Sequence, residues 1–167
     1  LSSGQPLALA KPADANPEGR ARVFGGVVVV PITSTRGSTK AGFAGWDLAS
    51  GRLLWSVLLK GDSHIMDTDA NRSSTTLFPG ATGSVLVANR GQARLVTFAE
   101  NKAMLVQDLN LRTGDLGSPD ARNYAYSWSG TPSITWEHDD PDAILVNVDS
   151  KLQRIPLTGT GKIVTYG

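Results

Sequence analysis

The chain has no cysteine among its 167 residues. Disulfide bonds, thiol nucleophiles and cysteine-ligated metal sites are therefore excluded, whereas the redox state of the compartment stays open. Long hydrophobic runs are missing as well. The longest uncharged apolar stretch, around Val27 to Ile32, has the length of one buried strand and not of a bilayer span. The formal net charge of +1, with 19% charged residues, gives no basis for binding nucleic acid or an anionic membrane surface.

Motifs of two common enzyme classes are also missing. The chain contains neither the Gly-x-Ser-x-Gly turn of nucleophilic hydrolases nor the Gly-x-x-x-x-Gly-Lys-Ser/Thr loop that cradles phosphate. The glycines of 114–117 and 159–161 are better explained as turn residues, because glycine accepts the positive φ that tight turns require.

Turn-forming residues are frequent instead. Eighteen glycines and nine prolines, with only two methionines, favour a β-rich chain. The length suits one domain with one buried core. Residues 1–20 are rich in Ser, Gly, Pro and Ala, lack apolar periodicity and start with Leu1, which suggests a processed or excised piece. We expect residues 1–20 to form a flexible leader or linker and residues 21–167 a single all-β repeat domain.

The stretch Gly45–Trp55 predicts the β-hairpin around which the other elements are organised. Gly51 supplies a positive φ in the turn, and the Asp47 carboxylate accepts hydrogen bonds from the turn backbone. Leu53 and Trp55 are two positions apart, so they share one face of the returning strand.

The same residues resemble the tryptophan-docking repeat of the quinoprotein-like (PQQ-like) β-propellers, whose pattern is roughly Ala-x-Asp-x-x-Thr-Gly-Lys-x-x-Trp. Asp47, Gly51 and Trp55 match this pattern outright, while Gly45, Ser50 and Arg52 replace its Ala, Thr and Lys. The resemblance implies that Trp55 docks on a neighbouring blade. Strand alternation places Trp46 on the side of Ala44 and opposite Asp47, where it either packs between sheets or lies exposed on the rim.

Two weaker copies of the pattern follow. Asn110–Leu116 resembles Asp47–Leu53, with Ser118 in the place of the tryptophan, and a third copy runs from Ala143–Val146 to Leu157–Ile163. The valine-rich runs at Val27, Val85 and Ile144 recur at nearly equal spacing. Such repeats predict antiparallel sheets arranged as a partial β-propeller of about three blades. Since rings close with four to eight blades, the arc is a fragment or is completed by another chain. A β-trefoil or a β-sandwich is the alternative.

An aromatic row is the best candidate for a binding site. Tyr124, Tyr126 and Trp128 alternate with small residues, so on a strand they share one face, near Gly130 and Pro132. Such a row stacks on a sugar ring or anchors a partner. Packing between adjacent blades is the other explanation.

Three polar groups suggest metal or acid–base chemistry only superficially. Asp67–Asn71 has the alternating oxygens of a calcium loop, but Arg72 and Phe78 stand where that loop needs Gly and Glu, so we expect an ordinary polar loop. His138–Asp142 collects carboxylates beside a histidine, and its Pro141 favours a solvated turn. His64 has no second ligand near it in sequence. No metal site is predicted.

The resemblance implies two classes of function: dehydrogenases that hold pyrroloquinoline quinone with a metal ion in a complete ring, and envelope scaffold proteins that bind partners without a cofactor. The chain is too short for a complete ring, lacks the adjacent cysteine pair of many such enzymes, and matches no cofactor ligand. We therefore expect a non-catalytic protein-interaction or scaffold module with no catalytic residues and no cofactor. Its partner is another protein or the remaining blades of the same protein, and oligomers are possible.

By the same resemblance, this module belongs to an extracytoplasmic assembly, in the cell envelope or secreted. The alternatives are a segment of a quinoprotein-type dehydrogenase and a carbohydrate-binding module.

Overall fold

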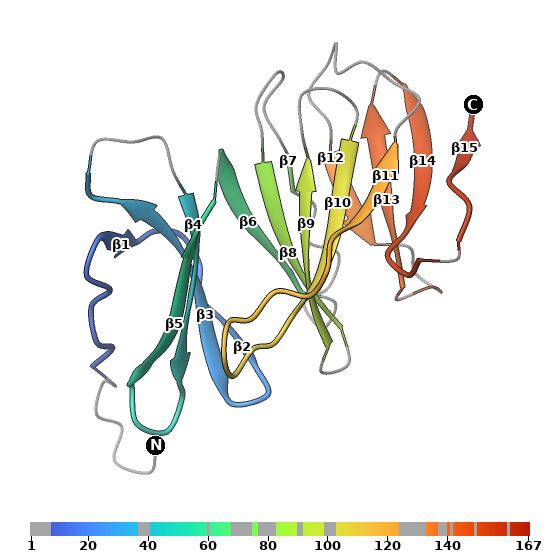
Figure 1. The fold of residues 1–167 in the computed structure, drawn as a ribbon. Coiled ribbons are helices and arrows are strands. Elements are labelled where there is room, and N and C mark those ends of the chain that lie inside the picture. The colour runs from blue at the N-terminus through green and yellow to red at the C-terminus, as the bar shows by residue number, and fades with distance from the viewer. Residues whose placement is uncertain are drawn as a thin grey trace.

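The computed structural model describes residues 8–36, 41–59, 61–67, 75–76, 83–89, 92–98, 103–123, 133–136, 140, 142–148, 150–159 and 161–167. Within these ranges every regular element is a β-strand, and the strands form three sheets that stand beside one another in chain order (Figure 1). The predicted all-β class is confirmed. The described strands form no closed barrel, which the trefoil alternative would require.

Each sheet has five described strands. The first contains β1 (Ala15–Pro17), β2 (Arg22–Phe24), β3 (Val27–Ser34), β4 (Ala41–Asp47) and β5 (Leu53–Leu58). The second contains β6 (Asp62–Asp67), β8 (Gly83–Asn89), β9 (Gln92–Phe98), β10 (Ala103–Leu109) and β11 (Asp120–Asn123). The third contains β7 (Thr75–Thr76), β12 (Ser133–Trp136), β13 (Ala143–Val148), β14 (Lys151–Pro156) and β15 (Val164–Tyr166).

The common unit of the three sheets is an antiparallel meander of four consecutive strands: β2–β5, β8–β11 and β12–β15. Each sheet has one further strand: β6 and β7 pair with the first strand of their meanders, whereas β1 pairs with the end of β3, on the same side as β2. In the second sheet this strand, β6, pairs in parallel with β8. The chain contributes β7 to the third sheet before it returns to β8, and parallel neighbours need such a crossover.

Alternation along the strands explains how the sheets pack. Val27 and Val29 of β3 face the second sheet, whereas Val28 and Val30 face away from it, and all four are buried. A strand that is buried on both faces reads as a continuous apolar run, which is why Val27–Val30 has no polar residue.

Apolar side chains fill both junctions between sheets. Between the first and second sheets lie Val27, Val29, Phe43, Trp55, Leu86, Ala93, Leu95 and Leu109. Between the second and third sheets lie Val85, Val87, Val96, Phe98, Met104, Val106, Ile134, Ile144, Val146, Ile155 and Leu157. The face of the first sheet that points away from the second carries its own buried cluster of Ala15, Val28, Val30, Ile32, Ala44 and Trp46.

Residues 8–20 do not form the low-order leader expected from the sequence. Ala15–Pro17 is strand β1, paired with the end of β3. Before it, the backbone N–H of Ala10 donates to the carbonyl of Gly51 at 3.1 Å. Ala10–Pro17 is therefore held against the first sheet, and only Ala15–Pro17 is a strand of it.

One predicted correspondence is wrong by a strand. Val27 lies on β3, directly before the strand that leads into the first turn, but Val85 lies on β8, with β9 between it and β10. The counterpart of β3 in the second sheet is therefore β9. Both β8 and β9 are buried on both faces, so the hydrophobic pattern cannot distinguish them. Ile144 on β13 does correspond to the Val27 strand, since β14 leads into the third turn.

Candidate functional site

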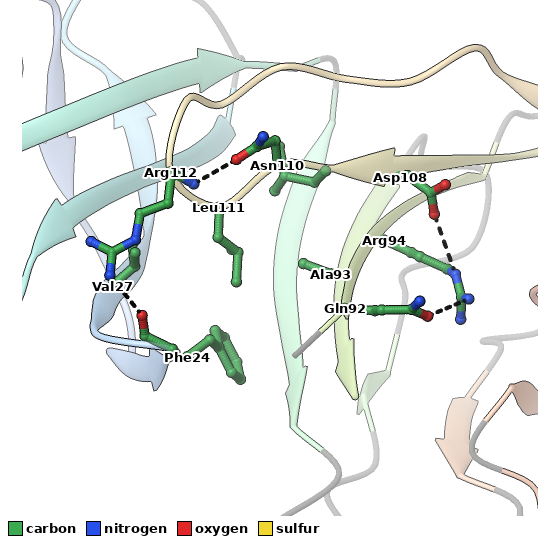
Figure 2. Close-up of a pocket in the computed structure, with 11 residues that line it drawn as sticks. Phe24, Val27, Gln92, Ala93, Arg94, Asp108, Asn110, Leu111 and Arg112 are labelled. Carbon is green, nitrogen blue, oxygen red and sulfur yellow. Dashed lines mark hydrogen bonds and ion pairs between the residues drawn. The ribbon is translucent and has the colours of Figure 1, made fainter. Parts of the chain in front are cut away.

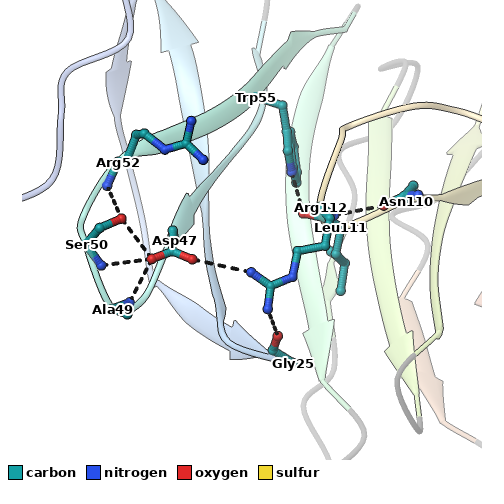
Figure 3. A network of polar contacts seen from close by, with 9 residues as sticks. All are labelled: Gly25, Asp47, Ala49, Ser50, Arg52, Trp55, Asn110, Leu111 and Arg112. Atoms are coloured by element: carbon teal, nitrogen blue, oxygen red, sulfur yellow. Dashed lines mark hydrogen bonds and ion pairs between the residues drawn. The ribbon is translucent and has the colours of Figure 1, made fainter.

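The first turn has the geometry that its sequence predicts (Figure 3). Oδ1 of Asp47 accepts hydrogen bonds from the backbone N–H groups of Ala49 at 3.1 Å and Ser50 at 2.8 Å, and from the Ser50 hydroxyl at 2.8 Å. The N–H of Gly51, at a φ of 71°, donates to the Asp47 carbonyl. The carboxylate thus accepts hydrogen bonds from turn N–H groups that would otherwise have no acceptor within the backbone.

The second turn repeats this arrangement. Oδ1 of Asn110 accepts from the backbone N–H groups of Arg112 at 2.9 Å and Thr113 at 3.3 Å. Gly114, at a φ of 78°, donates to the Asn110 carbonyl, as Gly51 does to that of Asp47. The repeat recognised in the sequence is therefore also a repeat of hydrogen-bond geometry.

Trp55 joins the first sheet to the second turn. Its Nε1–H donates to the carbonyl of Leu111 at 2.7 Å, and its ring lies between Gly45 of its own sheet and Gly114 of the next. A Cβ on Gly114 would lie 2.6 Å from the Trp55 ring, so only glycine fits there. The docking of Trp55 on a neighbouring sheet is confirmed. Trp46 is fully buried on the other face.

Arg112 reinforces the same junction. Its guanidinium donates to Oδ2 of Asp47 at 3.3 Å and to the carbonyl of Gly25 at 3.1 Å (Figure 3). The pKa of Asp47 is lowered from its ordinary value, chiefly by the hydrogen bond from the Ser50 hydroxyl and then by the Ser50 backbone, with a smaller effect of the Arg112 charge. Asp47 is therefore ionised at neutral pH and holds both its own turn and the next sheet.

A pocket of about 490 Å³ opens beside these turns, between the first and second sheets. Phe24 and Arg112 line one end of it and Arg94 and Asp108 the other, with Leu111 between them (Figure 2). The remaining lining residues are Gly25, Val27, Gln92, Ala93, Leu109 and Asn110. Because these come from two sheets, the pocket exists only when the sheets are packed.

The ionic groups at the far end of the pocket are neutralised within the protein. The side chain of Arg94 is 10% exposed and pairs with Asp142, directly before β13 of the third sheet, at 3.0 Å and with Asp108 at 3.4 Å. It also donates to Gln92 at 2.9 Å. Arg94 thus ties the second sheet to the third, and the lining of the pocket combines apolar side chains with polar and ion-paired ones.

The pocket supplies binding groups more readily than reactive ones. Its titratable side chains, Arg94, Asp108 and Arg112, are all in ion pairs. In the part of the chain that the structure describes, no group of three or more His, Cys, Asp or Glu side chains could hold a metal ion. A ligand or partner side chain that is mainly apolar and carries a few polar groups would suit this lining best.

The predicted aromatic row of Tyr124, Tyr126 and Trp128 lies outside the described residues, and so does most of the Asp67–Asn71 loop. Within His138–Asp142, two carboxylates are described. Asp140 forms an ion pair with Arg154, and Asp142 forms one with Arg94. Both carboxylates therefore have structural partners.

Sequence reasoning did not find the pocket or the Arg94 contact. Arg94 stands alone in the apolar run Ala93–Val96, and a single charge in a buried strand signals a partner elsewhere. That signal predicts a buried ion pair but does not identify Asp142 as the partner.

No model of a known protein family matches the chain, and a comparison with curated proteins also finds no match. Among the described residues there is no long apolar helix of the kind that crosses a membrane.

Proposed function

We propose that the chain is a non-catalytic protein-interaction or scaffold module, and that it joins a larger β-sheet assembly through the exposed face of its third sheet. The observation that carries this proposal is a correspondence between two sheet faces. One is the face of the first sheet that packs on the second, and the other is the face of the third sheet that points away from the second.

The pairing register gives the correspondence. In the first sheet Phe43 pairs with Val57, and Gly45 pairs with both Val29 and Trp55. In the third sheet the same positions before the turn are Leu152, paired with Tyr166, and Arg154, paired with Leu145 and Val164. We call this side of a sheet its forward face, defined by Val29, Phe43, Trp55 and Val57 in the first sheet and by Leu145, Leu152, Val164 and Tyr166 in the third.

The forward face of the third sheet is more exposed than that of the first, and beside its apolar side chains it carries Arg154 and the exposed Asn147. Phe43 and Trp55 are 2% and 7% exposed beneath the second sheet. Val164 and Tyr166 are 41% and 46% exposed. Val164 and Tyr166 are exposed at positions of the third sheet whose counterparts in the first sheet pack on a neighbouring sheet. Exposed apolar residues of this kind mark an interaction surface, and a further antiparallel sheet would pack on it face to face.

The resemblance of Asp47–Trp55 to the quinoprotein-like repeat supports the same function. In this proposal the three sheets are successive blades of a propeller, and the next sheet comes from further repeats of the same protein or from a protein partner. The proposed location, in the cell envelope or secreted, depends on that resemblance alone.

Self-association of the isolated chain tests the proposal, because a second copy carries the same forward face. We expect concentration-dependent dimers in sedimentation equilibrium. Val164 is 41% exposed, so Val164→Lys removes apolar contact worth about 1 kcal/mol and also places a charge on the face that association would have to bury. The dissociation constant should then rise about tenfold or more.

Thr165→Lys is the matched control. Thr165 is exposed on the same strand, β15, but it pairs with Gln153 and so lies on the opposite face from Val164 and Tyr166. The variant adds the same charge away from the forward face, so its association should match that of the unchanged chain. A chain that stays monomeric, or variants that weaken association equally, would contradict the proposal.

A further inference from the structure

The opposite side of each sheet also repeats, and we call it the backward face. Trp46, Leu109 and Ile155 each directly precede or begin a turn and pair with Val28, Ala93 and Ile144 respectively. The positions are Val28, Val30, Trp46, Leu48 and Leu53 in the first sheet, Ala93, Leu95, Leu109, Leu111 and Leu116 in the second, and Ile144, Val146, Ile155, Leu157 and Ile163 in the third.

In the second and third sheets the backward face packs on the sheet before it. All five positions of the second sheet belong to the cluster shared with the first, and all five of the third belong to the cluster shared with the second. In the first sheet the same five positions are equally apolar, and Trp46 is fully buried. A neighbouring sheet is expected there, but the described chain supplies another cover.

That cover is the segment Ala8–Pro17, which we call the strap. Ala10 accepts a hydrogen bond from Nε1 of Trp46 at 2.7 Å and donates to the Gly51 carbonyl at 3.1 Å. Ala15 lies in the buried cluster of this face. The strap is therefore bonded to the first turn at Gly51, much as the Trp55 side chain packs against the second turn at Gly114.

We propose that the strap is a displaceable stand-in for a sheet, and that the backward face of the first sheet is a second interaction surface that opens when the strap lifts. Its occupant is the forward face of the third sheet of a second copy, which gives a head-to-tail contact. This inference rests on the proposed function, since it uses the same forward face.

The contacts of the strap explain why it can be displaced. It pairs with β3 over three residues, Ala15–Pro17, and its buried side chains, Pro12 and Ala15, are smaller than the phenylalanine or tryptophan of a facing sheet. The ion pair of Asp14 with Arg36 is well exposed and adds little. A four-stranded sheet would make more contact with the same five positions.

The occupant follows from the junctions already formed. The backward faces of the second and third sheets each receive the forward face of the preceding sheet. In a second copy the forward face of the third sheet is exposed at Val164 and Tyr166, so it is available for the same contact. Such a contact is heterologous, and repetition of it builds rings or open chains of molecules.

The two tryptophans of the first sheet provide a test in the unchanged chain. The indole N–H of Trp46 is bonded to the strap and that of Trp55 to the second sheet, both at 2.7 Å. Trp46 is the more buried of the two, so exposure alone would give Trp46 the slower hydrogen exchange. If the strap lifts without global unfolding, Trp46 should exchange at least about tenfold faster in NMR measurements. Equal exchange, or slower exchange at Trp46, would overturn the proposal.

A pair of strap variants tests the consequence for association. Ala15 is 3% exposed and Ala13 is exposed, so Ala15→Asp drives the strap off the sheet while Ala13→Asp makes the same chemical change without disturbing it. We expect Ala15→Asp to form higher-mass species than Ala13→Asp at equal concentration, and the addition of Val164→Lys to abolish them. Far-UV circular dichroism confirms folding, and the tryptophan comparison decides if Ala15→Asp does not fold.

Each outcome separates the two proposals. A folded Ala15→Asp chain with the mass of Ala13→Asp would overturn the strap inference alone. Higher-mass species that persist with Val164→Lys would overturn the head-to-tail occupant. An absence of any effect of Val164→Lys in the chain with an intact strap would instead count against the proposed function.

Discussion

At the scale of single residues, the junction between the first two sheets depends on glycines that leave room for Trp55. Gly114 combines a positive φ with close approach of the indole ring, whereas Gly25 has a positive φ and open space around it. The two positions separate the cost of backbone strain from the cost of a steric clash.

Gly114→Ala should destabilise the protein more than Gly25→Ala. Both substitutions place alanine in the left-handed region, which costs about 1–2 kcal/mol. At Gly114 the added methyl group also meets the rigid Trp55 ring at 2.6 Å. Overpacking of this kind adds about 1–3 kcal/mol. Urea denaturation measures both, and equal losses for the two variants would contradict the proposed packing.

Several of these residues were predictable individually. Gly51 and Asp47 follow from turn chemistry, and the docking of Trp55 follows from the repeat pattern. Its partners were not predictable, because Leu111 lies 56 positions further along the chain and its carbonyl carries no sequence signal.

At the scale of elements, the first turn, at Asp47, and the second turn, at Asn110, use different side chains to accept hydrogen bonds from the turn backbone. Asp47 and Asn110 each accept two backbone N–H groups through Oδ1. Only the carboxylate titrates, so the turns differ in their response to pH and not in their geometry.

Asp47→Asn should flatten the acid limb of the stability curve. The folded-state pKa of Asp47 is lowered below the ordinary value of 3.8, so its contribution is complete above that value and is lost as the pH falls through the lowered pKa. Asparagine keeps the turn, as Asn110 shows, but cannot be protonated in this range. Thermal unfolding from pH 5 to pH 2 measures the difference.

The reverse exchange is the matched control. Asn110→Asp places a carboxylate against the same backbone donors, so it should steepen the acid limb that Asp47→Asn flattens. Parallel pH profiles for the unchanged chain and both variants would contradict this account of the turns.

The existence of the strands was easier to predict than their order. Apolar alternation and turn glycines located the hairpins, but they did not distinguish β8 from β9. The strap was missed for another reason. Ala8–Pro17 has small residues and prolines, so it carries no periodicity although the face it covers is apolar.

At the scale of the whole molecule, the second sheet has neighbours on both sides. Val85 and Leu86 are adjacent on β8 and belong to different buried clusters, one on each side of the sheet. In a row of sheets that contact only their neighbours, the middle member loses its contacts last.

Backbone hydrogen exchange should reveal this gradient. We expect the slowest exchange in β8 and β9, and faster exchange in β14 and β15 of the third sheet, whose forward face carries the exposed Val164 and Tyr166. Mass spectrometry of peptic fragments measures it. Greater protection of β14 than of β9 would contradict this order.

The packing of sheets in chain order was predictable from the repeats, whereas the exchange of strands between sheets was not. The place of β7 in the third sheet rests on two residues, Thr75 and Thr76, and nothing in their sequence points to a partner as distant as β12. Contacts of this kind are settled by tertiary packing and not by local propensity.

This placement of β7 has a consequence for synthesis on the ribosome. Thr75 and Thr76 emerge before any of the second sheet's meander, but their partners, Ile134 and Ser133, emerge only after residues 77–132 have been translated. At roughly 5–20 residues per second this delay lasts several seconds. During that interval the nascent chain can complete its first sheet and then its second, while the edge that β7 provides waits for the last fifth of the polypeptide.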